Sequence, residues 1–168
     1  MSSLLALVGS SSSGTAADHK AVPYLRTPFN ESQGQFSPDG HWIAYVSDES
    51  GGNQIYVQSY PTGAGKFQIS TGGGGAQVRW RRDGRELFYI AADGRLMAVT
   101  VRTAPTFGAG TPTMLFDPHI LFDNITYWRY DVSADGKRFL LNRILSRTDG
   151  SASPPITVVL NWNSALKH

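Results

Sequence analysis

The residue types best suited to metal chemistry gather in one stretch, FDPHILFDNITYW, which spans residues 116–128. His119 stands there between Asp117 and Asp123, and imidazole with carboxylate is a ligand combination that Zn, Mn and Fe accept. Glu31, from a loop earlier in the chain, could add an oxygen ligand. A bound divalent metal with an open coordination position would activate water for hydrolysis. The spacing matches no defined metal motif, so a hydrogen-bonded surface histidine is the alternative interpretation.

A second group of chemically useful residues lies at fixed distances before three Asp-Gly pairs, which begin at Asp39, Asp83 and Asp135. The positions six and four residues before each Asp are polar or charged, namely Gln33, Gln35, Gln77, Arg79, Arg129 and Asp131. Arginine can steady an oxyanion or a phosphoryl oxygen. The candidate catalytic or ligand-binding residues are therefore Arg79, Arg129 and Asp131. The alternative is that these three form a salt-bridge network in a water-filled pore.

The Asp-Gly pairs belong to a repeat. The segments QFSPDGHWIAYVS, VRWRRDGRELFYIA and YDVSADGKRFLLNR share an apolar residue, two intervening residues, Asp-Gly and then an alternating apolar strand. Asp-Gly between such strands favours a tight hairpin, because Gly accepts the positive φ that the turn requires. The turns are 44 and 52 residues apart, and a period of roughly 40–45 residues with four strands is typical of β-propeller blades.

This spacing predicts three blades of about four strands each, at residues 30–71, 75–117 and 126–163. The first strand of each blade would be innermost and would line a central channel, so the polar positions before each Asp should face that channel. The third blade lacks an outermost strand, and residues 21–26 read as the outer strand of a preceding blade. The sequence therefore predicts an all-β chain with half of a propeller over residues 19–168.

Composition agrees with an all-β domain and narrows the choice of partners. The chain has 168 residues with 18 Gly and 9 Pro, and its aromatic and β-branched residues fall in short runs, which is typical of strands joined by turns. A net charge of +2 is too small to indicate nucleic acid or an anionic membrane as a partner. The absence of cysteine excludes disulfides, thiolate zinc sites and a cysteine nucleophile.

The first 18 residues, MSSLLALVGSSSSGTAAD, read as a disordered leader with a flexible Ser/Gly run. The apolar run LLALVG is too short for a secretory signal and follows no basic residue. No stretch approaches the roughly 20 apolar residues of a membrane helix, so we expect a soluble, cytoplasmic chain. The alternative for the leader is a short helix that docks on a partner through Leu4, Leu5 and Leu7.

Four segments carry a family resemblance: TPFNESQGQFSPDGHWIAYVSDESG, WRRDGRELFYIAADGRLMAV, YDVSADGKRFLLN and PPITVVLNW. They resemble TolB-type, WD-like β-propeller repeats and, more narrowly, the C-terminal propeller segment of many bacterial serine/threonine protein kinases. The resemblance covers about residues 20–168. It implies a propeller that serves as a sensing or interaction module of six or more blades. It does not imply kinase activity, because the Gly-rich loop, HRD and DFG motifs of a kinase are absent.

Three blades cannot close a ring, and an open propeller exposes apolar blade faces and an unpaired edge strand. Two copies related by a two-fold axis, the commonest oligomer symmetry, would make six blades. Residues 21–26 of one copy could then complete the third blade of the other. We therefore expect a homodimeric six-bladed propeller closed by exchanged strands. A lone half-propeller or a higher assembly is the alternative.

Two functions remain open from the sequence. The first is a non-catalytic binding or scaffold module, derived from a sensor propeller, that takes a small polar or anionic ligand. The second is a metal-dependent hydrolase of esters, lactones, phosphate esters or phosphotriesters, with His119 and Asp123 as ligands of Zn or Mn at the channel mouth and Arg79 or Arg129 steadying the developing charge.

Overall fold

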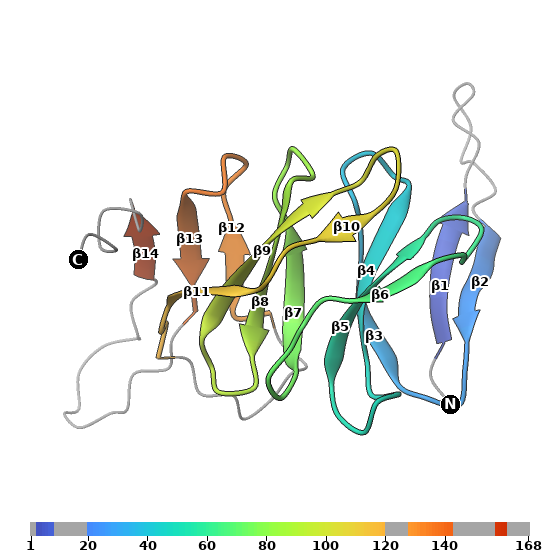
Figure 1. Ribbon diagram of the computed structural model, residues 1–168, viewed down its shortest axis with the longest axis horizontal. Helices are drawn as coiled ribbons and strands as arrows, with labels where there is room; N and C mark the ends of the chain where they lie inside the picture. The colour runs from blue at the N-terminus through green and yellow to red at the C-terminus, as the bar shows by residue number, and fades with distance from the viewer. Residues whose placement is uncertain (1–2, 9–19, 120–127, 143–156, 161–168) are drawn as a thin grey trace.

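The computed structural model describes residues 3–8, 20–119, 128–142 and 157–160 of the chain (Figure 1). Every regular element within these residues is a β-strand, and the strands pair antiparallel. They form sheets that stand side by side along the longest axis of the molecule (Figure 1). The described part of the chain contains no helix of the length and apolarity that a membrane crossing requires.

The first sheet is a four-stranded meander in the order β3 (Glu31–Phe36), β4 (Trp42–Ser47), β5 (Gln54–Ser59) and β6 (Lys66–Gln68). The second sheet begins in the same way, with β7 (Gly75–Trp80), β8 (Glu86–Ala91) and β9 (Leu96–Arg102). Two short strands then pair with β9, namely β10 (Gly108–Ala109) and β11 (Thr113–Phe116). The third sheet has the order β12 (Tyr130–Val132), β13 (Arg138–Leu141) and β14 (Thr157–Leu160).

The Asp-Gly turn between the first two strands of each sheet has one geometry throughout. Gly40, Gly84 and Gly136 each have a φ of 72°, and each glycine N–H donates to the carbonyl three residues earlier at 2.8–2.9 Å. The Asp carboxylate accepts the N–H two residues ahead, as from His41 to Asp39 at 3.1 Å. A residue with a side chain would be disfavoured at this left-handed φ, whereas glycine adopts it readily. The hairpins predicted from the three Asp-Gly pairs are confirmed.

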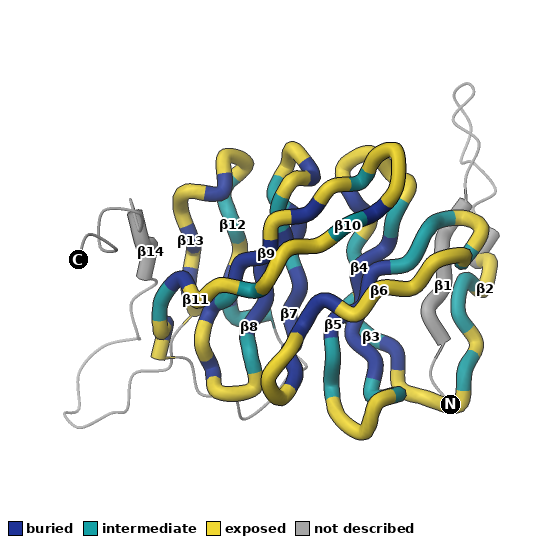
Figure 2. Tube along the Cα trace, viewed as in Figure 1, coloured by how far each residue is buried: buried dark blue, intermediate teal, exposed yellow. Residues whose placement is uncertain are grey.

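The sheets bury apolar side chains on both faces, because they stack against one another (Figure 2). The cluster between the first and second sheets contains Ala44, Val46, Ile55, Val57, Ile69, Ala76, Val78, Trp80, Leu87, Tyr89, Val99, Val101 and Phe107. The cluster between the second and third sheets contains Phe88, Ile90, Leu96, Ala98, Leu115, Tyr130, Phe139 and Leu141. Burial on both faces explains why β4 and β8 are apolar at consecutive positions.

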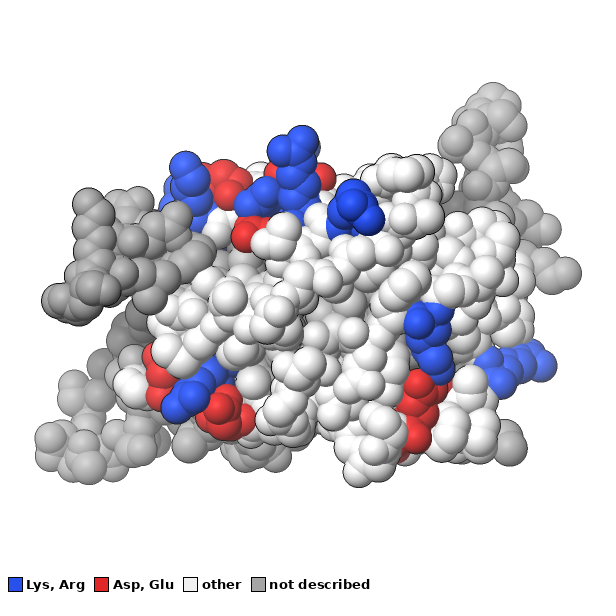
Figure 3. Space-filling model, viewed as in Figure 1, with Lys and Arg blue, Asp and Glu red and all other residues white. Residues whose placement is uncertain are grey.

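Charged side chains lie at the surface in mixed groups (Figure 3). Lys66 Nζ lies 2.5 Å from Glu49 Oε2, and Arg81 forms ion pairs with Asp83 and Glu86 across the second Asp-Gly turn. On the face that Figure 3 shows, acidic side chains lie beside basic ones, and some basic side chains stand apart.

The N-terminal strands differ from the expectation of a disordered leader. Residues 3–8 form β1 (Ser3–Val8), which pairs with β2 (Lys20–Arg26) in a two-stranded sheet. The physical reason is that β2 offers an open strand edge, and an adjacent apolar segment satisfies its backbone hydrogen bonds by pairing there. Tyr24 and Leu25 of β2 pack against the outer face of the first sheet, and the Tyr24 hydroxyl donates to the Ser59 carbonyl at 2.6 Å.

Candidate functional site

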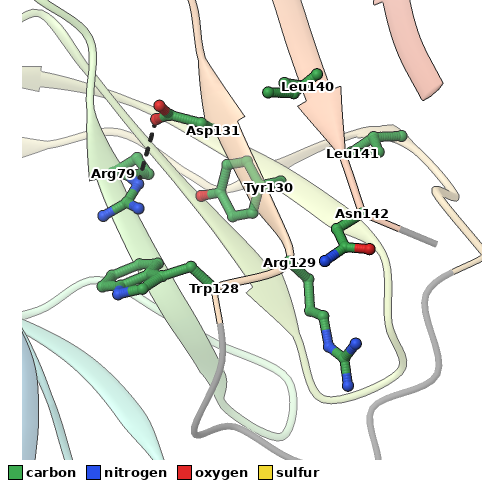
Figure 4. A pocket seen from close by; sticks show the side chains of 8 residues that line it. All are labelled: Arg79, Trp128, Arg129, Tyr130, Asp131, Leu140, Leu141 and Asn142. Atoms are coloured by element: carbon green, nitrogen blue, oxygen red, sulfur yellow. Dashed lines mark ion pairs between the residues drawn. The ribbon is translucent and has the colours of Figure 1, made fainter. Parts of the chain in front are cut away.

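A pocket of about 330 Å³ opens where the second and third sheets meet (Figure 4). It is lined by Arg79, Trp128, Arg129, Tyr130, Asp131, Leu140, Leu141 and Asn142. Arg79 comes from β7, the inner strand of the second sheet, and the other residues come from β12, β13 and the residues that flank them. Three of the residues that the sequence marks as candidates, Arg79, Arg129 and Asp131, therefore share one pocket.

Strand register brings the third-sheet residues together. Asp131 lies opposite Leu140 in the pairing of β12 with β13. The pairing continues one residue before β12 and one residue after β13, where the Asn142 N–H donates to the Arg129 carbonyl at 2.7 Å. Directly opposite residues of an antiparallel pair are close enough for their side chains to interact, so one wall of the pocket combines charged, amide and apolar surface.

Arg79 is held by two partners from the third sheet (Figure 4). Its guanidinium carbon lies 3.4 Å from the centroid of the Trp128 ring, well within the distance for a cation–π contact. Its Nε lies 3.4 Å from Asp131 Oδ1, and the two side chains are 18% and 67% exposed. Because water screens an ion pair this exposed, it adds little to stability. The two contacts instead orient the Arg79 guanidinium beside the pocket.

Tyr130 contributes a buried phenol to the pocket wall. The residue is 3% exposed, and its hydroxyl has no hydrogen-bond partner among the described residues. Burial raises the pKa of this phenol well above its ordinary value, because the phenolate would lose its hydration. The hydroxyl points toward Arg79 in Figure 4. It therefore stays protonated at neutral pH and can donate a hydrogen bond to a ligand.

Gln33 and Gln77 depart from the orientation that strand alternation predicts. Each stands at a β-bulge, where the pairing register shifts between residues 32 and 35 in the first sheet and between residues 76 and 79 in the second. Their φ angles are 56° and 60°, which is the left-handed region. A bulge turns the following side chains away from simple alternation. Gln77 is 1% exposed, so its side chain lies in the interior of this chain, between the sheets.

The two glutamine side chains connect the inner strands of successive sheets. Gln33 Oε1 accepts the Gln77 N–H at 2.5 Å, and Gln77 Oε1 accepts the Arg129 N–H at 2.8 Å. Arg129 occupies the same position of the repeat in the third sheet. Gln35 is half-buried, and its carbonyl accepts the Trp80 indole N–H at 3.2 Å. These contacts hold neighbouring inner strands together.

The residues predicted to bind a metal do not come together within the described part of the chain. His119 Nδ1 lies 3.1 Å from Asp117 Oδ2, and the His119 side chain is 69% exposed. Glu31 is buried in β3 of the first sheet, where it accepts a hydrogen bond from Thr27, whereas Asp117 and His119 follow β11 of the second sheet. Asp123 lies outside the described residues.

Among the residues that the structure describes, no three His, Asp or Glu side chains are placed to hold a metal ion together. Asp117 Oδ1 also accepts the His119 N–H at 2.7 Å, and His119 has a φ of 51°. A carboxylate that bonds the backbone two residues ahead is a local turn contact. The geometry therefore agrees with the alternative interpretation of His119 as a hydrogen-bonded surface residue.

Sequence reasoning missed the apolar and aromatic part of the pocket. No sequence pattern marks Leu140 or Asn142, because they reach the pocket only through their register with β12 and its flank. Trp128 and Tyr130 flank Arg129 in the sequence. That adjacency is the signal that could have found them.

Solved structures provide the comparison for this arrangement. TolB from Acinetobacter baumannii has a TM-score of 0.52 and 16% identity, and the match covers 72% of this chain and 28% of TolB. Oligogalacturonate lyase from Vibrio parahaemolyticus has a TM-score of 0.55 and 15% identity, covering 84% of this chain and 36% of the lyase. An oligogalacturonate lyase in complex with manganese has a TM-score of 0.54 and 18% identity, covering 89% and 39%.

No model of a protein family and no curated protein matches the chain. The chain spans well under half the length of each of the three structures named above. At 15–18% identity they establish the fold alone. TolB and oligogalacturonate lyase are both β-propellers, and the antiparallel sheets of this chain stack as blades do. The chain therefore has a β-propeller fold of the kind seen in TolB.

Proposed function

We propose that the chain is a non-catalytic β-propeller module that binds a small polar or anionic ligand in the pocket between the second and third sheets. The observation that carries this proposal is the arrangement of Arg79, which lies over Trp128 and beside Asp131 at the pocket. A sensing role would agree with the resemblance to the propeller segments of bacterial serine/threonine kinases.

The chemistry of the lining favours binding. Its eight side chains supply two guanidinium groups, one amide, one protonated phenol and the apolar surface of Leu140, Leu141 and Trp128. The volume of about 330 Å³ falls in the range of small-molecule sites, which combine apolar walls with a few placed polar groups. Asp131, the carboxylate in this lining, is engaged with Arg79, which suits an orienting role better than proton transfer.

Calorimetric titration with three probes tests this function: benzyl alcohol, benzoate and phenyl phosphate. Trp128→Ala should abolish binding of whichever probes the unmodified protein takes, because it removes both apolar wall and the support of Arg79. Arg138→Ala is the matched control, since Arg138 is an exposed cation on β13 outside the pocket lining. Binding that survives Trp128→Ala, or no binding by any probe, would contradict the proposal.

A metal-dependent hydrolase is the weaker alternative. Within the described residues its support is one pair, Asp117 with His119, and the manganese named for one neighbour belongs to a protein of 18% identity. Hydrolysis of p-nitrophenyl esters or phosphates that is lost both on chelation and in His119→Ala would establish it. Turnover that is unchanged by both treatments, or no turnover at all, would remove it.

The open faces of the stack support the proposed six-bladed homodimer, in which each chain contributes three blades. In the repeat, Phe36 is equivalent to Trp80, and Leu140 is equivalent to Phe88. Trp80 and Phe88 are 9% and 0% exposed, buried between sheets, whereas Phe36 and Leu140 are 49% and 47% exposed at the two ends of the stack.

A second copy whose first sheet stacks on the third sheet would repeat the internal contact and bury both residues, provided that β2 leaves the outer face of the first sheet, on which Tyr24 and Leu25 pack in the single chain. Exchange of residues 21–26 between copies would give the third sheet an outer strand. In the single chain β2 instead pairs with β1, so exchange requires β2 to give up that pairing.

Light scattering after size-exclusion chromatography tests the dimer. The expected mass is twice the 18.3 kDa of one chain, and Leu140→Asp should reduce it to that of a monomer. Met114→Asp is the matched control, because Met114 is also 47% exposed but lies on β11, which pairs with β9 of the second sheet and not with the third sheet. A monomeric unmodified protein, or equal effects of the two substitutions, would show that the third sheet is not the interface.

A further inference from the structure

One position of the repeat has a structural task in the first two sheets and a different residue in the third. Six residues before each turn Asp stand Gln33, Gln77 and Arg129. The glutamines use their side-chain oxygens as acceptors, each for the backbone N–H of the equivalent residue in the next sheet. The position therefore joins neighbouring inner strands wherever glutamine occupies it.

Arginine cannot perform that task, because the guanidinium group carries donors and no acceptor. Arg129 receives the bond from Gln77 through its backbone, and its side chain lines the pocket. In Figure 4 the Arg129 guanidinium extends away from the Arg79–Asp131 pair, on the side of Asn142. The third sheet thus replaces an interstrand acceptor with a cation at a pocket wall.

The charges of the lining point to the sign of the ligand. Arg79 and Asp131 form one ion pair, and Arg129 adds a second guanidinium group to the lining. A guanidinium group presents donors in a fork that matches carboxylate and phosphate oxygens, and the Asn142 amide beside it can donate as well.

The remaining lining residues indicate what kind of group the other end of the ligand carries. Trp128 gives the pocket apolar surface, and the protonated Tyr130 hydroxyl is a further donor on its wall. The volume of about 330 Å³ leaves room for a ring-sized apolar group beside an anionic group. An amphipathic anion would use both kinds of surface at once.

We propose that Arg129 binds the anionic end of an amphipathic small molecule, a carboxylate or phosphate monoester whose apolar or aromatic part rests on Trp128. This inference depends on the proposed ligand-binding function and assigns its ligand class and its anchoring residue. Because one guanidinium carries the recognition of charge, neutral analogues of the same shape bind independently of residue 129.

Arg129→Gln is the informative variant, since it installs the residue that the first two sheets already carry at this position and so preserves the inner strand. Arg138→Gln, with the same charge change on β13 outside the lining, is the control. Phenyl phosphate and benzyl alcohol are titrated into each variant by calorimetry, and urea unfolding checks that both variants stay folded. We expect phenyl phosphate to bind Arg129→Gln about tenfold or more weakly, as removal of a charge-assisted contact predicts, with benzyl alcohol unaffected.

The outcomes separate this inference from the proposed function. If Arg129→Gln binds phenyl phosphate as the unmodified protein does while Trp128→Ala does not, the pocket binds ligands and the role of Arg129 is refuted. If Arg129→Gln weakens both probes equally, Arg129 acts by packing and the inference is again refuted. If no probe binds any variant, both proposals fail.

Discussion

The side-chain oxygen of Gln77 lies 2.8 Å from the backbone nitrogen of Arg129 and joins the inner strands of two sheets by one hydrogen bond. Gln77 is 1% exposed and has a φ of 60°. A buried side chain in the left-handed region pays a conformational cost that only a specific contact offsets. The bond to Arg129 is such a contact, and it sets the position of the strand that carries the pocket.

Gln77→Ala should lower the free energy of unfolding by about 1–3 kcal/mol, the cost of leaving a buried backbone donor without its acceptor. Alanine keeps the same backbone strain, so the loss reports the amide group. Gln77→Gly removes the same bond but relaxes the left-handed backbone, and it should therefore be the less destabilised of the two. Urea unfolding followed by tryptophan fluorescence measures both, and a Gln77→Ala protein as stable as the unmodified one would contradict the account.

The repeat pattern predicts much of this fold because its signals are local. The three Asp-Gly turns and the apolar strands that follow them correspond to the hairpins β3–β4, β7–β8 and β12–β13. The burial of Gln77 was not predictable, because a β-bulge interrupts the period of two and leaves no mark in residue type. Leu140 and Asn142 escaped detection for another reason, since their place at the pocket depends on pairing between distant strands.

The glycine run before β7 provides a test of close packing between loops. A Cβ at Gly74 would meet the Asn53 carbonyl oxygen far inside van der Waals contact, and the Gly75 N–H donates to that same carbonyl at 2.8 Å. Gly73 has a similar φ, 111° against 105°, but a Cβ there would meet nothing within 4 Å.

Gly74→Ala should therefore destabilise the protein more than Gly73→Ala, by about 1–3 kcal/mol, as overpacking against a fixed backbone does. The backbone strain of alanine at positive φ is common to both variants and cancels in the comparison. Thermal unfolding by circular dichroism gives the difference. Equal losses in the two variants would mean that strain, and not the contact with Asn53, makes glycine necessary at position 74.

Phe88 tests whether the second and third sheets share one core. It is 0% exposed and packs edge-on against Phe139, with ring centroids 5.2 Å apart at 83°. Phe88→Ala should lower the free energy of unfolding by about 3–5 kcal/mol, since the stacked sheets cannot close over the cavity. Phe29→Ala, at a residue that is 38% exposed, should cost far less. Chemical denaturation of the two variants checks this, and similar losses would show that the sheets do not pack as a common core.

The carboxyl group of Asp83 links stability to pH. Its pKa is lowered to about 2 from an ordinary 3.8, chiefly by the hydrogen bond from Arg81. A group whose pKa is lower in the folded state stabilises the fold above its unfolded pKa, and this contribution is lost as pH falls through the folded value. Asp83 should therefore stabilise the turn fully above about pH 5 and progressively less as the pH falls from there to below about 2.

Asp83→Asn keeps an acceptor for the Arg85 N–H but removes the charge that Arg81 contacts. At pH 6 the variant should be less stable by about 0.2–1 kcal/mol, the range for exposed ion pairs, and most of the difference should be lost by pH 2. Asp93→Asn serves as the control. It removes a surface carboxylate of similar exposure whose ion pair, with Arg95 at 3.5 Å, is longer than that of Asp83 with Arg81. Urea unfolding across this pH range decides the matter: a difference that persists at pH 2 would assign the role of Asp83 to the turn's hydrogen bonds and not to its charge.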